Sequence, residues 1–350
     1  MRRKRNKEID SDRIVKQLRK TLKKTTVTVL KDPKYISTVV DGISTQCLAL
    51  DLIIGRPGVP VGRLTEVTGL EGHSKSTTAA HLLAEVQRRG GVGVLFDTES
   101  GFDIERSEAM GIDTSKLITL SPKNMEDVFE NMEHSIITLR KSVGRDTPIV
   151  IVWDSVAGTP TKDENAKKYD ERTMASAAKV LAQGLRKLTP VMAKYRVAVV
   201  FVNQLRDSFG WGRKRPKSFG GHAIRYHASL RIQVRSMQME RDEETDEPVG
   251  IWVEAMVIKN KVGKPFRKAK YFVYFETGID KYRDLLDSAI HLGVARRAGA
   301  YIKMGKLSIR KSKWKRWIKK SGGWDKVYAD FVKYAIENGK MKTYDVEART

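Results

Sequence analysis

The segment "GLEGHSKST", Gly69–Thr77, decides how the rest of the chain is interpreted. It follows the spacing of a phosphate-binding loop, G-x-x-x-x-G-K-[ST], except that Ser74 stands where the second glycine belongs. The residues before it, "RLTEV", are typical of a strand, and those after it, "KSTTAAHLLAEVQRR", are typical of an amphipathic helix. A helix that begins here presents free N–H groups and the positive end of its dipole to an anion. The cofactor-binding residues predicted in this segment are Gly69, Leu70, Glu71, Gly72, His73, Ser74, Lys75, Ser76 and Thr77.

The chemistry of this loop depends on its last residues. Lys75 is expected to reach the β- and γ-phosphates of a nucleotide, and Ser76 to bind Mg²⁺. Ser74 raises a question, because a side chain at this position crowds the phosphates. Gly69 and Gly72 remain to supply the permissive backbone angles.

Acidic residues follow two later apolar stretches. Asp97 and Glu99 follow "VLF", and Asp154 ends "IVIVWD". ATP hydrolysis needs Mg²⁺ held by a carboxylate and a second carboxylate that orients the attacking water. Asp154 suits the first role together with Ser76, and Glu99 suits the second. Taken singly, each acid has the alternative of a solvated residue capping a loop, but their order behind the phosphate loop indicates an ATP-hydrolysing site.

The apolar stretches predict the fold. "RLTEVT", "GVGVLFD", "PIVIVWD" and "RVAVVFVNQ" are short and rich in β-branched residues, which is typical of parallel strands covered on both faces. Helical patterns fill the stretches between them, at about 75–89, 124–141 and 171–195. The expected fold class is therefore α/β, with a mostly parallel, doubly wound sheet and ligands at the carboxyl ends of its strands. "LRIQVR", "GIWVEAMVIK" and "AKYFVYFE" alternate more and are expected to extend the sheet as antiparallel hairpins.

Three regions are expected along the chain. Residues 11–24 place Ile14, Leu18 and Leu22 on one helix face, and "TTVTVL" (25–30) is typical of a short strand with nothing local to pair with. Residues 1–34 are thus expected to be an oligomerisation arm that contacts a neighbouring subunit. Residues 35–278 form the expected α/β core. Residues 279–350, helical and basic in character, are expected to be a small separate domain.

Composition narrows the class of protein. The single cysteine, Cys47, excludes an internal disulfide, and no apolar run approaches the roughly 18 residues of a membrane span. The N-terminus is charged and lacks the apolar stretch of a signal peptide, so a cytoplasmic protein is expected. The net charge of +24 is carried by residues 1–34, 206–217 and 296–320. Such patches indicate a polyanionic partner, and nucleic acid is the first candidate. The alternative is that the basic surfaces only aid solubility.

Residues 201–221, "FVNQLRDSFGWGRKRPKSFGG", combine two kinds of signal. Asn203 and Gln204 are amides at the end of an apolar strand, placed to sense a γ-phosphate. After them, aromatic residues alternate with cations and glycines, which is typical of a loop that binds single-stranded nucleic acid. A flexible exposed loop is the alternative. The DNA-binding residues predicted here are Arg206, Phe209, Trp211, Arg213, Lys214, Arg215, Lys217, Gly220 and Gly221. In residues 296–320, Trp314 and Trp317 lie among cations, which indicates a duplex-DNA patch; a solvated face over a two-tryptophan core is the alternative.

From about residue 43 to 292 the chain resembles a RecA-type recombinase. The resemblance is carried by "ISTQCLALDLIIGRPGVPVGRLTEVTG", "DTES", "VWDSVAGTPTK", "FVNQLR", "GGHAIRYHASLRI" and "VIKNKVGKPF". It implies that Glu99 is the catalytic acid and that Gln204 links ATP to DNA. It also implies that Lys259 and Lys261 reach the ATP of a neighbouring subunit. The catalytic residues implied are Glu99, Lys75, Gln204, Lys259 and Lys261.

Further positions match the family individually. Asp103 matches an acid that contacts adenine, while Arg106 replaces an aromatic residue that stacks on adenine in many members. Met174 and Lys179 match DNA-contacting positions. Ser74 and "TGIDKYRDLLDSAIHLG" are similar to phage-encoded, UvsX-like members.

The resemblance implies a RecA-like ATPase core that uses ATP and Mg²⁺. It implies a DNA recombinase that forms helical homo-oligomers on single-stranded DNA and also acts on double-stranded DNA. A single-strand-binding protein and a mediator are further candidate partners, in the cytoplasm of a bacterium or of a phage-infected host. One alternative is a non-hydrolysing filament or loader protein, supported by Ser74 and opposed by Glu99, Lys259 and Lys261. A ring-forming helicase of the same fold is opposed by the N-terminal arm.

Overall fold

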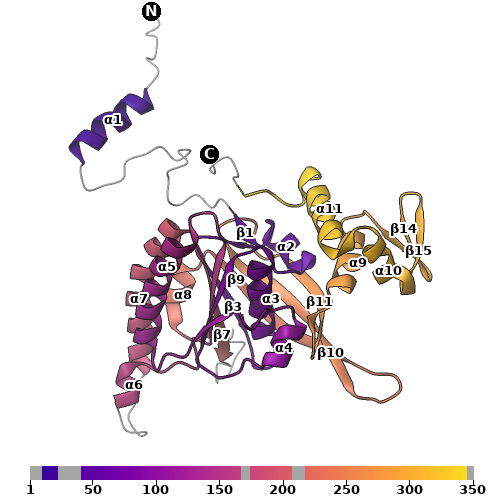
Figure 1. The fold of residues 1–350 in the computed structure, drawn as a ribbon, viewed down its shortest axis with the longest axis horizontal. Helices are drawn as coiled ribbons and strands as arrows, with labels where there is room; N and C mark the ends of the chain where they lie inside the picture. The colour runs from indigo at the N-terminus through magenta and orange to yellow at the C-terminus, as the bar shows by residue number, and fades with distance from the viewer. Residues whose placement is uncertain (1–9, 23–40, 167–173, 207–216, 345–350) are drawn as a thin grey trace, which may run out of the picture.

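A computed structural model describes residues 10–22, 41–166, 174–206 and 217–344 (Figure 1). Its centre is a ten-stranded sheet in the order β12-β11-β10-β9-β3-β7-β6-β4-β5, with β8 attached to β7. Its strands are β3 (Leu64–Gly69), β4 (Val92–Asp97), β5 (Ile118–Leu120), β6 (Ile149–Asp154), β7 (Ala198–Arg206), β8 (Lys217–Ser218), β9 (Leu230–Arg241), β10 (Pro248–Asn260), β11 (Lys268–Tyr274) and β12 (Gly278–Ile279). The predicted α/β class is confirmed, whereas the strand predicted at 25–30 lies outside the described residues.

The direction of the strands determines where a ligand site forms. Every neighbouring pair from β5 to β9 is parallel, and the pairs from β9 to β12 are antiparallel, as the alternation in their sequences predicts. Consequently β3, β4, β6 and β7 all end at one edge of the sheet. The loop, acids and amides that follow these strands are gathered there.

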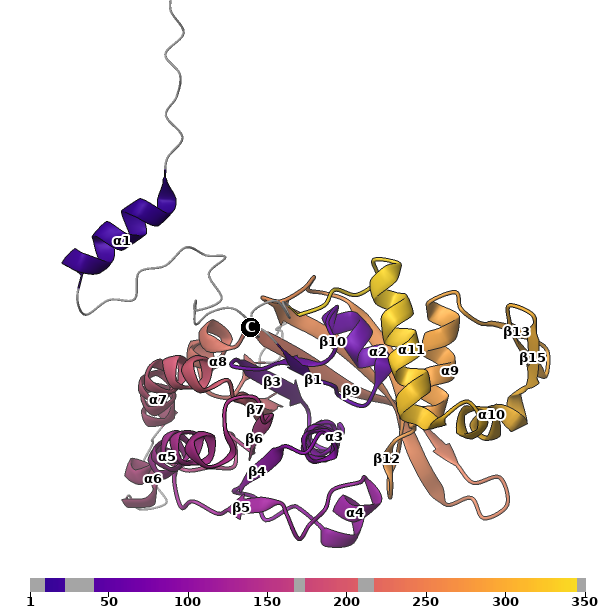
Figure 2. The same cartoon turned by 45° about the horizontal axis from the view of Figure 1, so that its top comes forward.

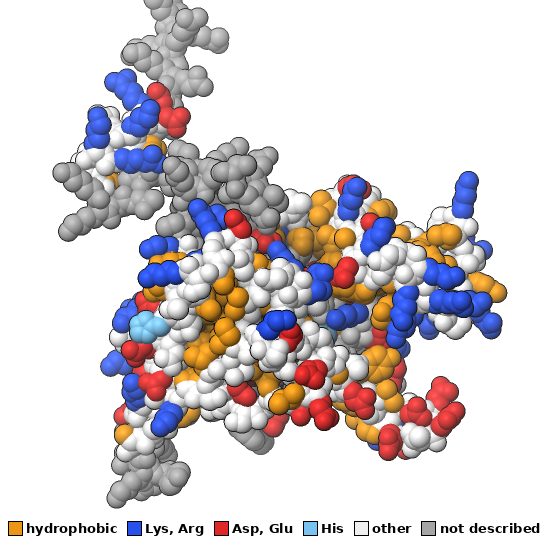
Figure 3. Space-filling view, viewed as in Figure 1, with side chains coloured by type: hydrophobic (Ala, Val, Ile, Leu, Met, Phe, Trp, Pro, Cys, Tyr) orange, Lys and Arg blue, Asp and Glu red, His pale blue; other side chains and the backbone are white. Residues whose placement is uncertain are grey.

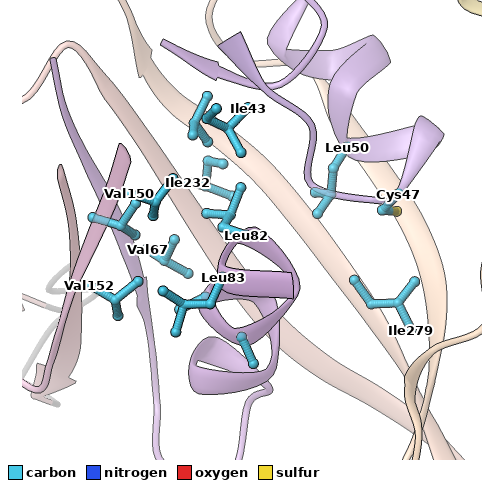
Figure 4. Packing of buried hydrophobic residues seen from close by; sticks show 14 of the residues in the cluster. Ile43, Cys47, Leu50, Val67, Leu82, Leu83, Val150, Val152, Ile232 and Ile279 are labelled. Atoms are coloured by element: carbon cyan, nitrogen blue, oxygen red, sulfur yellow. The ribbon is translucent and has the colours of Figure 1, made fainter. Parts of the chain in front are cut away.

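Helices cover both faces of the sheet (Figures 1 and 2). On one face, α3 packs through Leu82 and Leu83 against Val67, Val150, Val152 and Ile232 of the strands, a core shown in Figure 4. On the other face, α5, α7 and α8 enclose a second core around Trp153 and Phe201. The helices of the core are α2 (Leu48–Ile54), α3 (Lys75–Arg88), α4 (Ile104–Ala109), α5 (Met125–Val143), α6 (Lys162–Ala166), α7 (Met174–Tyr195) and α8 (Gly221–His227), with β1 (Gly42–Ile43) and β2 (Val59–Pro60) as a short ladder beside them. Both faces are buried, which explains why the strands are almost wholly apolar.

The C-terminal region, expected to be helical, also contains strands. It contains α9 (Lys281–His291), β13 (Arg296–Ala298), β14 (Tyr301–Met304), β15 (Leu307–Arg310), the 3₁₀ turn η1 (Lys311–Lys313), α10 (Trp314–Lys320) and α11 (Gly323–Glu337). The three strands form an antiparallel sheet whose turns use Gly299 and Gly305 at φ of 57° and 53°. Dense Lys and Arg residues hid this alternation in the sequence. The region also shares a core with Leu48 and Leu52 of α2, so its packing is continuous with the α/β core.

The N-terminal helix α1 (Ser11–Thr21) lies apart from the body of the chain (Figures 1 and 2). The predicted apolar stripe is present, since Ile14, Leu18 and Leu22 are 45%, 42% and 43% exposed. Among the helices that the structure describes, none has the length and apolar character needed to cross a membrane.

Candidate nucleotide-binding and hydrolysis site

The loop between β3 and α3 keeps a glycine-like backbone at its unusual position. Ser74 has φ of 57° and ψ of 26°, a left-handed conformation that non-glycine residues adopt at a cost of about 1–2 kcal/mol. Its carbonyl accepts hydrogen bonds from the Thr78 backbone N–H at 3.1 Å and the Thr78 hydroxyl at 3.0 Å. Gly69 has no room for a side chain, because a Cβ would lie 2.5 Å from the Val234 carbonyl oxygen. The serine therefore changes the side chain of the loop but not its course.

Lys75, the first residue of α3, is buried inside this loop. Its Nζ donates to the Leu70 carbonyl oxygen at 2.7 Å. Burial lowers the pKa of the ammonium, while the charges of Asp154, Glu99 and Glu71 oppose that shift. A desolvated cation held by a single neutral oxygen is well suited to pair with a phosphate.

Ser76 and Asp154 come together as the sequence predicted. Burial raises the pKa of Asp154 to about 6; a hydrogen bond from the Ser76 hydroxyl opposes the shift, and the charges of Glu99 and Asp97 add to it. Asp97 is the direct partner of Asp154 across the β4–β6 ladder. Within the described ranges, no cluster of three or more His, Cys, Asp or Glu side chains forms a metal site. One carboxylate with one hydroxyl is instead a donor set that fits Mg²⁺ completed by phosphate and water oxygens.

Glu99 and Gln204 meet at the carboxyl edge of the sheet although they are far apart in sequence. Gln204 Nε2 donates to Glu99 Oε1 at 3.4 Å, and the Ser155 hydroxyl donates to the same oxygen. Gly158 leaves space for this carboxylate, since a Cβ there would lie 2.6 Å from Glu99 Oε1. The sequence interpretation assigned no role to Ser155 and Gly158, although the run of small residues after Asp154 was the available signal.

Asn203 does not occupy the position predicted for it. Its side chain is fully buried, with Nδ2 donating to Glu66 Oε1 at 2.8 Å and to the Phe219 carbonyl oxygen at 3.0 Å. Residues alternate along β7, so Asn203 and Gln204 point to opposite faces of the sheet. The prediction that both amides sense a γ-phosphate is therefore wrong for Asn203.

Two lysines of β10 and its following turn lie near the opposite edge of the sheet from the phosphate loop. Lys259 is the Cα partner of Arg231, the second residue of β9, and the Lys261 N–H donates to the Ser229 carbonyl at 2.8 Å. Lys259 Nζ donates to the Arg225 and Tyr226 carbonyl oxygens at the end of α8, the latter at 3.0 Å. Burial, followed by the charge of Lys261, lowers the pKa of Lys259. These two residues thus lie away from the chain's own phosphate loop.

Beside α3, a cavity of about 20 Å³ adjoins the phosphate loop, with Ser76, Phe102, Asp103 and Arg106 among its lining. Asp103 caps α4 by accepting from the Arg106 N–H at 2.7 Å. The Arg106 guanidinium donates to Thr77 Oγ1 and to the Phe275 carbonyl oxygen, each at 2.8 Å. The acid matched to adenine contact thus lies near the loop, and Arg106 lines the same cavity.

The predicted DNA-binding residues are only partly within the described chain. Phe209, Trp211, Arg213, Lys214 and Arg215 lie outside it. Arg206 and Lys217 are backbone partners where β7 meets β8, so the two ends of that loop are joined. Gly220 and Gly221 precede and begin α8 with φ of 79° and 61°. On α7, Met174 is the first residue and Lys179 is exposed.

In the C-terminal region, Trp314 and Trp317 stack at 4.9 Å between ring centroids, and Trp314 is 4% exposed. They form a two-tryptophan core, as the alternative interpretation expected, and the duplex-DNA patch stays a prediction. The surrounding cations are exposed, and Figure 3 shows Lys and Arg side chains gathered over this part of the surface.

The fold and site define a P-loop ATPase with a RecA-like core. The family profile of the RecA N-terminal domain matches residues 9–280. Protein RecA of Campylobacter fetus is 35% identical over 298 residues, covering 85% of this chain and 83% of that protein. Protein RecA of Thermus thermophilus is 36% identical over 275 residues, 78% of each chain, and that of Campylobacter lari is 33% identical over 337 residues, 95% and 94% of the two chains. The chain belongs to the RecA family, and it is a DNA-dependent ATPase that functions in DNA recombination and repair.

Proposed function

We propose that this protein assembles into helical filaments on single-stranded DNA, with ATP bound between adjacent subunits, and promotes homologous pairing and strand exchange. The observation that carries the proposal is the contact between Glu99 and Gln204 at 3.4 Å. It joins the residue implied in water activation to the strand that leads into the predicted DNA loop. This hydrogen bond therefore connects the proposed hydrolysis site to the proposed DNA-binding loop.

Within one subunit, the proposed roles follow the donor chemistry. Lys75 exchanges the Leu70 carbonyl for phosphate oxygens, and Ser76 with Asp154 holds Mg²⁺, which supplies charge neutralisation when bound. Glu99 orients the attacking water, held in place by the Ser155 hydroxyl. Asp103 contacts the base from the rim of the small cavity.

Between subunits, Lys259 and Lys261 reach the neighbour's nucleotide. Their position near the opposite edge of the sheet supports this assignment, because a head-to-tail contact can bring that edge to the next phosphate loop. Residues 1–34 form the arm that contacts a neighbour, supported by the exposed stripe of Ile14, Leu18 and Leu22. Residues 35–278 are the ATPase core, and residues 279–350 are a basic domain that recruits double-stranded DNA.

The remaining proposals are finer. Single-stranded DNA is bound by the loop that contains Trp211, together with Met174 and Lys179 of α7. Ser74 and "TGIDKYRDLLDSAIHLG" support a place in the phage-encoded branch. A single-strand-binding protein and a mediator are proposed partners, in the cytoplasm of a bacterium or a phage-infected host.

Electron microscopy with single-stranded DNA and a slowly hydrolysed ATP analogue tests the assembly. The proposal expects continuous helical filaments that need both ligands. Steady-state ATP turnover on the same DNA tests the chemistry. Closed rings would contradict the filament. Filaments without any turnover would favour the alternative of a non-hydrolysing DNA-protection or loader protein.

A further inference from the structure

An ion pair lies buried in the middle of the central sheet. Glu66 of β3 is fully buried, and it accepts a hydrogen bond from Arg231 Nε of β9, which is 9% exposed. The two residues are Cα partners across the β3–β9 ladder. A buried ion pair is weak evidence for stability, because desolvation offsets much of its attraction. Its hydrogen bond with Asn203, the residue before Gln204, indicates a further role for the pair.

Asn203 connects this pair to the base of the DNA loop. Its Nδ2 donates to Glu66 Oε1 at 2.8 Å and to the Phe219 carbonyl oxygen at 3.0 Å, so both amide hydrogens are used. The Phe219 N–H in turn donates to the Gln204 carbonyl oxygen at 3.3 Å. Phe219 directly follows β8, where the chain returns from the loop. Asn203 thereby ties the end of β7 to the returning strand.

These hydrogen bonds hold the backbone at Gln204 in place. Asn203 is anchored on the α8 face of the sheet, and its neighbour Gln204 projects from the other face towards Glu99. The Gln204 carbonyl accepts from the Phe219 N–H, and Phe219 packs against the second core. A shift of Asn203 would therefore move both the amide that meets Glu99 and the strand that returns from the loop.

We propose that Asn203 is a positioning residue for Gln204, and that the buried side-chain oxygen of Glu66 holds Asn203 in register. Asn203 touches neither nucleotide nor DNA in this role. It couples the position of Phe219 to that of Gln204, so that DNA bound at the loop changes the contact between Gln204 and Glu99. The proposal rests on the proposed function of Gln204 as the link between ATP and DNA.

A matched pair of double variants separates positioning from folding. Glu66→Gln with Arg231→Met removes both charges but keeps a side-chain oxygen for Asn203 Nδ2. Glu66→Leu with Arg231→Met removes the charges and that oxygen. Replacing a buried ion pair by groups of similar volume is often neutral or stabilising, so both are expected to fold, which thermal unfolding checks. Asn203→Leu is the third variant, and it leaves the ion pair intact.

The readouts are nucleotide affinity of the full chain without DNA, and kcat and KM of ATP turnover with and without single-stranded DNA. The Glu66→Leu double variant and Asn203→Leu should bind nucleotide like the wild type. They should lose DNA stimulation of kcat by about 10-fold or more, since small misplacements of a catalytic group are costly. The Glu66→Gln double variant should retain the stimulation.

Equal DNA stimulation of kcat in the two double variants would overturn the proposal. A loss of nucleotide affinity that accompanies the loss of stimulation in the Glu66→Leu double variant would also overturn it. If only one double variant folds, Asn203→Leu decides in its place, and retained stimulation there overturns the proposal. Gln204→Ala is the control for the proposed function. If that variant keeps its DNA stimulation, the role of Gln204 itself is wrong, whatever Asn203 does.

Discussion

Ser74→Gly should stabilise the protein without tightening nucleotide binding. Ser74 holds a left-handed backbone at φ 57°, which costs a non-glycine residue about 1–2 kcal/mol. Glycine removes this cost but adds about 0.5–1 kcal/mol of conformational entropy to be lost on folding. The Ser74 hydroxyl makes no capping hydrogen bond to α3, so the substitution removes no cap. The net expectation is about 0.5–1 kcal/mol of added stability.

The strain belongs to the backbone of the loop itself, so we expect its relief in folding rather than in nucleotide affinity. The midpoint of thermal unfolding should rise by roughly 1–3 °C for a domain of this size. The assay pairs that scan of nucleotide-free protein with titration of a fluorescent ATP analogue. Ser74→Ala is the matched control, because it deletes the hydroxyl and keeps the strained Cβ. Gly72→Ala is the reverse control: φ is 70° and nothing lies within 4 Å of a Cβ, so only strain is added.

Two results would refute this reasoning. If Ser74→Ala stabilises the protein as much as Ser74→Gly, backbone strain is not the cause. If Ser74→Gly instead raises nucleotide affinity by an order of magnitude with no change in unfolding, the serine side chain obstructs the phosphates, and the loop geometry described here is not the limiting factor.

Four further predictions test other parts of the site. Glu99→Gln should bind ATP and DNA but turn over at least about 100-fold more slowly, measured as steady-state hydrolysis; equal turnover would contradict its role. Lys259→Ala and Lys261→Ala should leave nucleotide binding by the single subunit intact but abolish ATP-stabilised assembly. Mixing either variant with Lys75→Ala should restore some of the nucleotide sites between subunits. Loss of nucleotide binding by the isolated subunit would refute the assignment of these lysines to a neighbour's site. Trp211→Ala should weaken single-strand binding about 5- to 150-fold. Neutralising the four cations Lys313, Lys315, Arg316 and Lys319 should instead lower the salt slope of duplex binding by about three to four units and leave ATP turnover stimulated by single-stranded DNA unchanged. If both variants lost single-strand and duplex binding in parallel, the assignment of the two DNA forms to different regions would be contradicted. Burial raises the pKa of Asp51 to about 7. Between pH of about 4 and 7 the folded protein therefore holds a proton that the unfolded chain has released, and the free energy of unfolding should fall as pH rises. Urea unfolding of Asp51→Asn should lack this part of the pH dependence, and an unchanged dependence would exclude Asp51 as its source.

The sequence predicted the sheet and the phosphate loop because their signals are local. Strands buried on both faces are almost wholly apolar, as β6 and β7 show, and the phosphate loop has a fixed spacing. The positions of Lys75, Ser76 and Asp154 followed from the rule that parallel strands place their carboxyl ends at one edge. Ser74 is the residue of the loop that departs from the motif, and its backbone adopts the left-handed angles that glycine favours.

What the sequence missed depends on side chains that meet across strands. Asn203 and Gln204 are adjacent amides, and the sequence gives no reason to place one rather than the other near the nucleotide. Only the structure shows that their side chains lie on opposite faces of the sheet. Glu66 lies in an apolar strand, and nothing local shows that Arg231 will pair with it. The strands β13 to β15 were missed because cations occupy positions that alternation would otherwise mark.

The proposed role of Lys259 and Lys261 at a neighbour's nucleotide constrains how subunits assemble. The phosphate loop follows the carboxyl end of β3, whereas Lys259 and Lys261 lie towards the amino end of the neighbouring β9. A two-fold symmetric dimer joins a surface to its own copy, so it cannot bring these different edges together unless one patch contains both. A head-to-tail contact can, and it repeats from subunit to subunit. Such contacts close into rings only when the rotation permits; otherwise they give open helices, which is the geometry that a filament along DNA requires.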